Sequence, residues 1–182
     1  MGAPLVLSLC DFTGEWSRPY REAGYRVRQV DLAHGDDVRL MRAPGEPVRG
    51  ILAAPPCCHF SRAGARWWKE KGDAALLEGL SVVDACLRLV AVCEPDWWVL
   101  ENPIGRLKDY LGDPVEKFDP CDFGDPSTKR TWLWGRFNSP ARARVEPERV
   151  DWITRVPGGR NQKVIRSATP AGFARAFFEA NP

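Results

Sequence analysis

The sequence lacks the features that mark membrane and secreted proteins. No apolar run approaches the roughly 20 residues that a membrane-spanning helix needs. The opening residues, MGAPLVLSLCDF, place no basic residue ahead of the apolar stretch and carry Asp11 directly after it, so we expect no secretory signal. Together these absences predict a cytoplasmic protein with no membrane partner.

Paired cysteine spacings are also missing. The chain has six cysteines, Cys10, Cys57, Cys58, Cys86, Cys93 and Cys121, in apolar or turn contexts. This distribution favours reduced thiols over a disulfide framework. A metal site built from Cys57, Cys58, His59 and Cys121 is the competing interpretation. Cysteine ligands of one metal ion are usually separated by two or more residues, and Cys57 and Cys58 are adjacent. We therefore expect no metal.

An excess of one charge is absent as well. The 26 basic and 24 acidic residues leave a net charge of +2, which says little about partners. The distribution is less even, since residues 141–166 hold seven basic and three acidic side chains. A positive segment on a near-neutral body suits a phosphate-bearing partner, although a solvated basic loop explains it equally well.

What the chain does have is an alternation of strand and helix patterns. Buried or alternating apolar runs at residues 5–9, 25–31, 48–56 and 96–103 predict strands. Between the last two, apolar residues recur at steps of three and four from Leu76 to Val90, as in a helix with one buried face. Aromatic pieces after Phe118 predict a closing antiparallel pair, and Thr169 is the expected cap of a final helix. The pattern predicts one α/β domain, residues 1–182, with a mostly parallel sheet.

Small polar clusters follow the predicted parallel strands, and ligands bind outside the carboxyl ends of such strands. Gly14 lets a backbone turn approach a ligand, Asp31 is placed to accept hydrogen bonds from a ribose, and Asp36 or Asp37 faces an adenine amino group. A tight turn with capping aspartates is the simpler alternative. Trp16 stands where a G-x-G-x-x-G motif has its second glycine, which disfavours a pyrophosphate. A nucleoside without a diphosphate fits better.

Two further clusters carry groups suited to covalent chemistry. In AAPPCCHFS, two prolines stiffen the approach of Cys57 to the same edge of the sheet, where a thiolate can act as a nucleophile. In WWVLENP, burial beside Trp97 and Trp98 favours the protonated form of Glu101, which can then donate a proton to a ring nitrogen. A capping role for Glu101 is the alternative for that cluster alone.

Taken in order, these motifs resemble those of the DNA cytosine-5 methyltransferases. The first motif is matched by Phe12, Thr13 and Gly14, the nucleophile motif by Ala53, Ala54, Pro55, Pro56, Cys57, Phe60 and Ser61, the Glu-Asn pair by Glu101 and Asn102, and the last motif by Ala168, Pro170, Ala174, Arg175 and Ala176. The resemblance covers most of the chain up to Gly135 and again after Arg166.

The resemblance implies a Rossmann-like methyltransferase fold, S-adenosylmethionine as cofactor and DNA as partner. It implies a reaction in which Cys57 adds to carbon 6 of a flipped cytosine, Glu101 protonates nitrogen 3, and carbon 5 takes the methyl group. The catalytic set is then Cys57, Glu101, Lys129 and Arg130; the cofactor set is Phe12, Gly14, Trp16, Asp31, Asp37, Pro55, Ser167 and Thr169; the nucleic-acid set is Ser61, Arg62, Arg66, Lys69 and Asn102.

The chain departs from the family in its length. Residues 136–165 form a short basic insertion where the family carries a target-recognition domain, as in a compact, phage-type enzyme. A segment this small cannot bury a core of its own. Two alternatives therefore stay open. One is a catalytically weak nucleic-acid-binding module of the same fold, and the other is cytosine methylation of RNA or of a free nucleotide.

Overall fold

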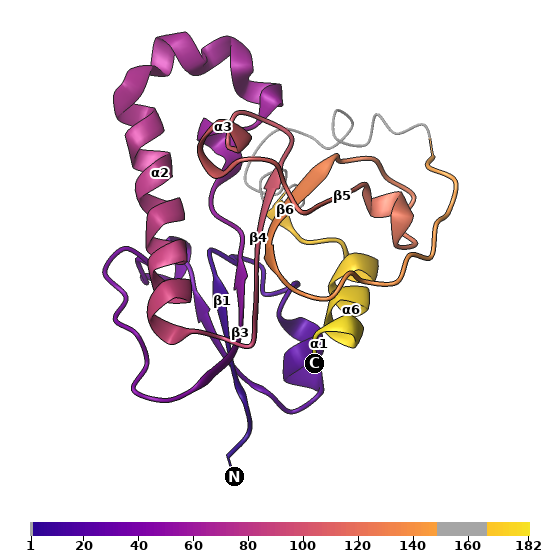
Figure 1. Ribbon diagram of the computed structural model, residues 1–182. Coiled ribbons are helices and arrows are strands. Elements are labelled where there is room, and N and C mark those ends of the chain that lie inside the picture. The colour runs from indigo at the N-terminus through magenta and orange to yellow at the C-terminus, as the bar shows by residue number, and fades with distance from the viewer. Residues whose placement is uncertain (1, 149–166) are drawn as a thin grey trace.

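A six-stranded sheet forms the centre of the protein, of which the computed structural model describes residues 2–148 and 167–182 (Figure 1). The strand order is β2-β1-β3-β4-β6-β5. The strands are β1 (Leu5–Leu9), β2 (Arg26–Val30), β3 (Val48–Ala53), β4 (Trp97–Pro103), β5 (Glu116–Phe118) and β6 (Thr131–Arg136). The first four pair in parallel and the last two close the sheet antiparallel, which confirms the predicted α/β fold.

Helices cover both faces of this sheet (Figure 1). The long helix α2 (Trp68–Cys93) lies on one face, and α1 (Arg18–Glu22) lies with α6 (Ala171–Ala180) on the other. All five residues of β1 are buried between these layers, which is why its sequence is continuously apolar rather than alternating. None of the helices in the described ranges is long and apolar enough to cross a bilayer.

The start of α6 differs from the prediction. Thr169 does not cap this helix, because the helix begins one residue later, after Pro170, with no side-chain cap from its own segment. A carboxylate from a distant turn helps instead, since the backbone N–H of Gly172 donates to Asp125 Oδ2 at 3.2 Å. A tertiary contact thus provides the hydrogen-bond acceptor at the start of α6 that the local residue Thr169 was expected to provide.

The chain reverses its direction of travel across the sheet at β1, which has β2 on one side and β3 on the other. Such a switch point opens a crevice outside the carboxyl ends of the strands. The segments that leave β1 and β3 run side by side there, joined by a 2.9 Å hydrogen bond from the Ala54 backbone N–H to the Leu9 carbonyl. This edge positions the candidate site.

The first part of the basic insertion, residues 136–148, packs on the body of the protein. Arg142 and Arg144 both pair with the buried carboxylate of Asp122, at 3.1 and 2.6 Å, and Arg142 also pairs with Glu116 at 3.2 Å. Two of the basic residues predicted to face a phosphate partner are therefore paired with carboxylates of the protein body. The rest of the insertion, residues 149–165, lies outside the described residues.

Candidate functional site

Residues 54–60, called the nucleophile segment below for the role that the sequence predicts for Cys57, leave β3 through Pro55 and Pro56 and enter a short 3-10 helix, Cys57–His59. Asn102, at the end of β4, holds this segment from the side, because its Nδ2 donates to the Pro55 carbonyl at 2.8 Å. Asn102 is fully buried. Its side chain positions the nucleophile segment, and its contact with nucleic acid stays a prediction.

A second support for the nucleophile segment comes from the residues that follow β4. The Arg62 backbone N–H donates to the Ile104 carbonyl at 2.9 Å, and the Arg106 N–H donates to the Phe60 carbonyl at 3.0 Å. Between them, a Cβ on Gly105 would lie only 1.9 Å from the Phe60 oxygen, so only glycine permits this approach. The sequence analysis did not identify Gly105 or Arg106. A glycine just after a strand-end motif is the signal by which this place in the chain could have been found.

Cys57, Glu101 and Lys129 meet at this edge and influence one another electrostatically. Glu101 Oε1 is buried and has no hydrogen-bond partner within the described ranges. Burial raises the pKa of Glu101, and the Lys129 charge opposes that rise. Cys57 is an exposed residue, yet protein atoms surround its sulfur, so burial and then the Glu101 charge raise its pKa while Lys129 lowers it. The direction of this shift is the one that a proton-donating role for Glu101 requires.

The two basic residues predicted beside the base lie in different surroundings. Lys129 lines a small hollow with Glu101, whereas Arg130 pairs with Asp119 at 2.7 Å. That hollow has a volume of about 10 Å³, room for about one water molecule. Ser167 and Thr169 also line it, so the fold brings the last sequence motif to the acid.

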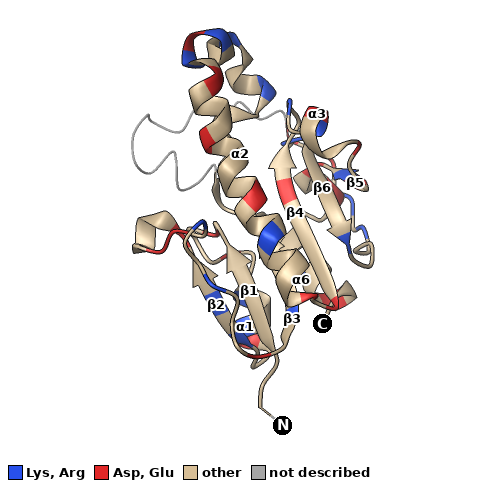
Figure 2. Ribbon diagram, turned by 60° about the vertical axis from the view of Figure 1, so that its left-hand side comes forward, with Lys and Arg blue, Asp and Glu red and all other residues tan. Residues whose placement is uncertain are grey.

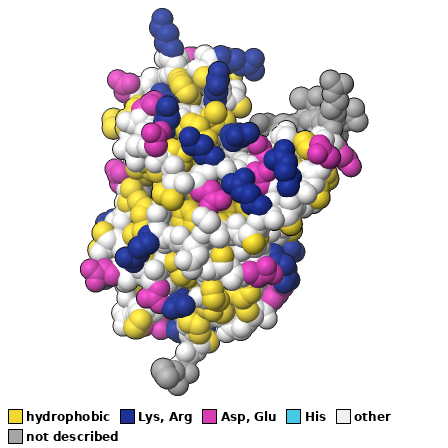
Figure 3. All heavy atoms as spheres, turned by 45° about the vertical axis from the view of Figure 1, so that its right-hand side comes forward, with side chains coloured by type: hydrophobic (Ala, Val, Ile, Leu, Met, Phe, Trp, Pro, Cys, Tyr) yellow, Lys and Arg dark blue, Asp and Glu magenta, His cyan; other side chains and the backbone are white. Residues whose placement is uncertain are grey.

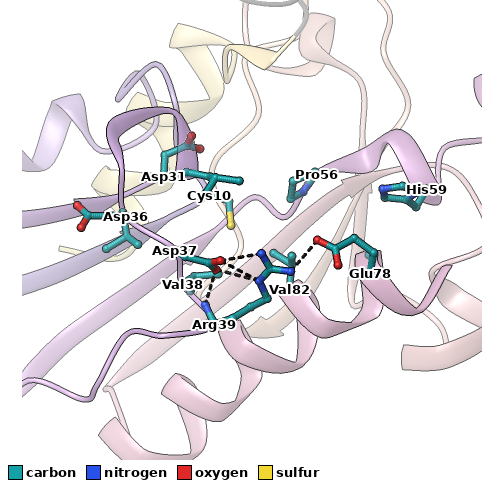
Figure 4. Close-up of a pocket in the computed structure, with 13 residues that line it drawn as sticks. Cys10, Asp31, Asp36, Asp37, Val38, Arg39, Pro56, His59, Glu78 and Val82 are labelled. Atoms are coloured by element: carbon teal, nitrogen blue, oxygen red, sulfur yellow. Dashed lines mark hydrogen bonds and ion pairs between the residues drawn. The ribbon is translucent and has the colours of Figure 1, made fainter. Parts of the chain in front are cut away.

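A larger cavity opens at the switch point, on the side of β2 (Figure 4). Its volume is about 140 Å³. The lining residues come from the ends of β1 and β2, the nucleophile segment and α2, and are Cys10, Val30, Asp31, Leu32, Asp36, Asp37, Val38, Arg39, Pro56, His59, Glu78, Gly79 and Val82. Asp31 and Asp37 of the predicted cofactor set lie here, while Pro55 lies one residue from the lining Pro56. Cys10, Arg39 and Glu78 were not anticipated. For Glu78 the reason is that nothing local shows that α2 forms a wall of this cavity.

Arg39 bridges two walls of this cavity (Figure 4). Its guanidinium donates to both oxygens of Asp37, from Nη2 at 2.6 Å and from Nε at 2.9 and 3.1 Å, and to Glu78 Oε1 at 2.6 Å. These hydrogen bonds from Arg39 lower the pKa of Asp37. Asp37 therefore ties its loop to α2. Asp31, whose Oδ1 accepts the Ala33 N–H at 2.8 Å, is the better placed carboxylate for a ligand.

The turn after β1 is shaped by Gly14, whose φ of +71° suits glycine and whose N–H donates to Asp11 at 2.9 Å. Phe12 is exposed, with its ring 5.7 Å from that of His34. Trp16 is fully buried, and its ring packs 6.0 Å from the ring of Phe173. The structure therefore places Trp16 in the core, and it is not one of the residues that line the cavity; its contact with a cofactor stays a prediction.

The remaining predicted nucleic-acid residues follow the nucleophile directly. Ser61 accepts the Ala63 N–H at 3.3 Å and begins a 3-10 helix, Arg62–Trp67, whose side chains include the exposed Arg66. Lys69 is exposed in the first turn of α2. In Figure 2 the ribbon at the upper end of α2 carries several basic residues, drawn in blue. In residues 2–148 and 167–182, no group of three or more His, Cys, Asp or Glu side chains is arranged to hold a metal ion.

Comparison with known proteins supports the fold. No protein-family model and no curated protein matches this sequence. The chain is similar to the crystal structure of a protein assigned as a DNA modification methyltransferase, encoded within a prophage of Escherichia coli. The TM-score is 0.53 at 16% sequence identity, and the match covers 98% of this chain and 70% of the other. The chain therefore has the Rossmann-like α/β fold of that methyltransferase.

Proposed function

We propose that the protein transfers a methyl group from S-adenosylmethionine to carbon 5 of a cytosine in DNA, through a covalent adduct with Cys57. The observation that carries this proposal is the meeting of Cys57, Glu101 and Lys129 at the carboxyl edge of β3 and β4. A nucleophilic sulfur, a carboxyl group with a raised pKa and a cation are the groups that addition to a pyrimidine ring requires.

Each group has a defined task in the proposed reaction. The Cys57 thiolate forms a bond to carbon 6, and Glu101 gives its proton to nitrogen 3, which leaves carbon 5 nucleophilic. The Lys129 charge stabilises the anionic forms of both Cys57 and Glu101. After carbon 5 has gained the methyl group, which leaves S-adenosylhomocysteine, it loses its proton to water as the Cys57 sulfur leaves as thiolate. Nitrogen 3 then returns its proton to the Glu101 carboxylate, which restores the ring and the acid.

The residues of the larger cavity fit S-adenosylmethionine. Four carboxylates, from Asp31, Asp36, Asp37 and Glu78, line it with one guanidinium, that of Arg39. This negative wall disfavours phosphate groups and suits the hydroxyl and amino donors of a nucleoside. When bound, S-adenosylmethionine supplies an electrophilic methyl group on a positively charged sulfur.

Asp31→Asn tests the cavity. The amide keeps the shape but removes a charged acceptor, so we expect the Kd for S-adenosylmethionine to rise about tenfold or more, measured by isothermal titration calorimetry. Asp96→Asn, in an exposed pair with Arg49, is the matched control and leaves the Kd unchanged. An unchanged Kd in Asp31→Asn would exclude the cavity as the cofactor site.

Lys129→Met tests the cation. Because the Lys129 charge lowers the pKa of both Cys57 and Glu101, its removal is expected to move both limbs of the kcat/KM profile to higher pH. Activity at neutral pH falls by about 10²-fold. Lys129→Arg keeps the charge and restores the position of the profile. A profile that stays in place in Lys129→Met contradicts the proposed role.

The acceptor is tested with labelled S-adenosylmethionine and duplex DNA, transfer RNA and cytosine nucleotides side by side. We expect label in duplex DNA, and bisulfite sequencing of DNA from an expressing host then gives the methylated positions. Label in RNA or nucleotide alone assigns a different acceptor. DNA binding without label assigns a binding module of the same fold.

A further inference from the structure

Residues 61–71, called the arm below, project from the nucleophile segment beyond the carboxyl edge of the sheet (Figures 1 and 2). The arm is held at both ends. Ser61 pairs with Gly105 in an isolated β-bridge, and Lys71 Nζ donates to the Cys58 carbonyl at 2.9 Å. Gly72, with φ +66° and ψ −173°, breaks the helical path and separates the arm from the rest of α2. The arm therefore begins and ends beside the nucleophile.

The surface of the arm suits a nucleic acid backbone. Its charged side chains are exposed and comprise the basic Arg62, Arg66, Lys69 and Lys71 and the acidic Glu70. Figure 3 shows Lys and Arg side chains over the upper half of the molecule, the half that carries this end of α2. A cationic projection next to the reactive sulfur is placed to meet phosphates on either side of a target base.

The two tryptophans of the arm lie in different environments. Trp68 is half-buried, with the Arg106 guanidinium 4.6 Å from its ring centroid, and Arg106 Nε in turn donates to the His59 carbonyl at 2.8 Å. Trp67 is 45% exposed, with the Arg66 guanidinium 4.9 Å from its ring centroid. Trp68 thus anchors the arm to the body, while Trp67 presents a large ring to solvent among cations.

The structure assigns Trp67 as the side chain that stacks inside the DNA duplex in the space left by the target base. This inference rests on the proposed function, in which the cytosine leaves the stack to reach Cys57. Extrusion of a base costs stacking and pairing energy, and an aromatic ring inserted in its place recovers part of it. Arg66 beside the ring adds a cation next to the phosphates that flank the gap.

The test compares duplex plasmid DNA with the same DNA heat-denatured to single strands. We expect Trp67→Ala to lower the rate of methyl incorporation into the duplex by about tenfold or more, and to leave the rate on single strands within about twofold of wild type. Trp67→Phe keeps a stacking ring and retains most of the duplex rate. Leu77→Ala, which removes another exposed apolar side chain from α2, is the control and changes neither rate.

Binding gives a readout that needs no turnover. Wild type is expected to bind a labelled duplex with one abasic site more tightly than the intact duplex, and Trp67→Ala is expected to lose this preference. Equal losses on duplex and single strands, or an unchanged duplex rate, would overturn the assignment. If wild type methylates no DNA the proposed function fails. The preference for the abasic duplex then tests the role of Trp67 independently. If wild type shows no such preference, that role is overturned.

Discussion

Cys57→Ala is expected to abolish methyl incorporation into DNA, by at least about 10³-fold, while S-adenosylmethionine still binds. The loss is large because no other group in the site can form and break the bond to carbon 6. Binding persists because Cys57 does not line the larger cavity, whose nearest lining residues in the chain are Pro56 and His59. The measurements are label incorporation and calorimetric binding on the same preparation.

Cys58→Ser is the matched control for this variant. Cys58 is an exposed residue next to Cys57 in the chain, and the hydrogen bond that it accepts from Lys71 uses its backbone carbonyl, so a serine leaves that contact in place. Activity near wild type is expected. DNA containing 5-fluorocytosine, which blocks loss of the carbon 5 substituent, should form a covalent complex with wild type and Cys58→Ser but not with Cys57→Ala. Normal turnover in Cys57→Ala would remove the covalent mechanism.

Glu101→Gln is expected to lower kcat by about 10² to 10⁴-fold. A glutamine amide can donate a hydrogen bond to nitrogen 3, but it cannot transfer a proton, so carbon 5 stays a poor nucleophile. The effect belongs in kcat rather than in the Kd for S-adenosylmethionine, because Glu101 does not line the larger cavity. A variant with wild-type kcat would show that the base is activated by another group.

The same substitution is expected to stabilise the protein. Burial raises the pKa of Glu101 in the folded state, so folding disfavours its ionised form. A carboxyl group of this kind favours the folded state at low pH, and that contribution is lost as pH rises from the unfolded pKa, about 4.3, through the higher folded value. Glu101→Gln should therefore raise Tm at neutral pH and show a smaller difference near pH 4. An equal shift at both pH values would contradict this account.

The sequence predicted the sheet and the reactive residues because both depend on local patterns. Strand β1 is continuously apolar since it is buried on both faces, and the helical period from Leu76 to Val90 follows the face that α2 turns to the sheet. Cys57 and Glu101 follow or end such strands. The carboxyl ends of parallel strands share one edge, so their convergence could be expected without coordinates.

Trp16 and Asn102 show what the motifs leave undetermined. Both stand in motifs that suggest contact with ligands, yet Trp16 fills the core beside α6 and Asn102 turns inward to Pro55. A sequence motif gives a residue's place along the chain but not the side to which its side chain turns. The direction of the side chain depends on which sequence-distant part of the protein packs against the residue.

By itself, the sequence determined the α/β alternation, the strand-end position of the candidate nucleophile and acid, and the acidic cluster that follows β2 at Asp31. The tertiary structure alone decided that Arg39 joins Asp37 to Glu78 across the cavity, that Gly105 admits the Phe60 carbonyl, and that Trp67 is exposed while Trp68 is held. Apolar periodicity depends only on residues that are close in the sequence. Hydrogen bonds and close contacts between remote segments form only once the sheet has brought those segments together.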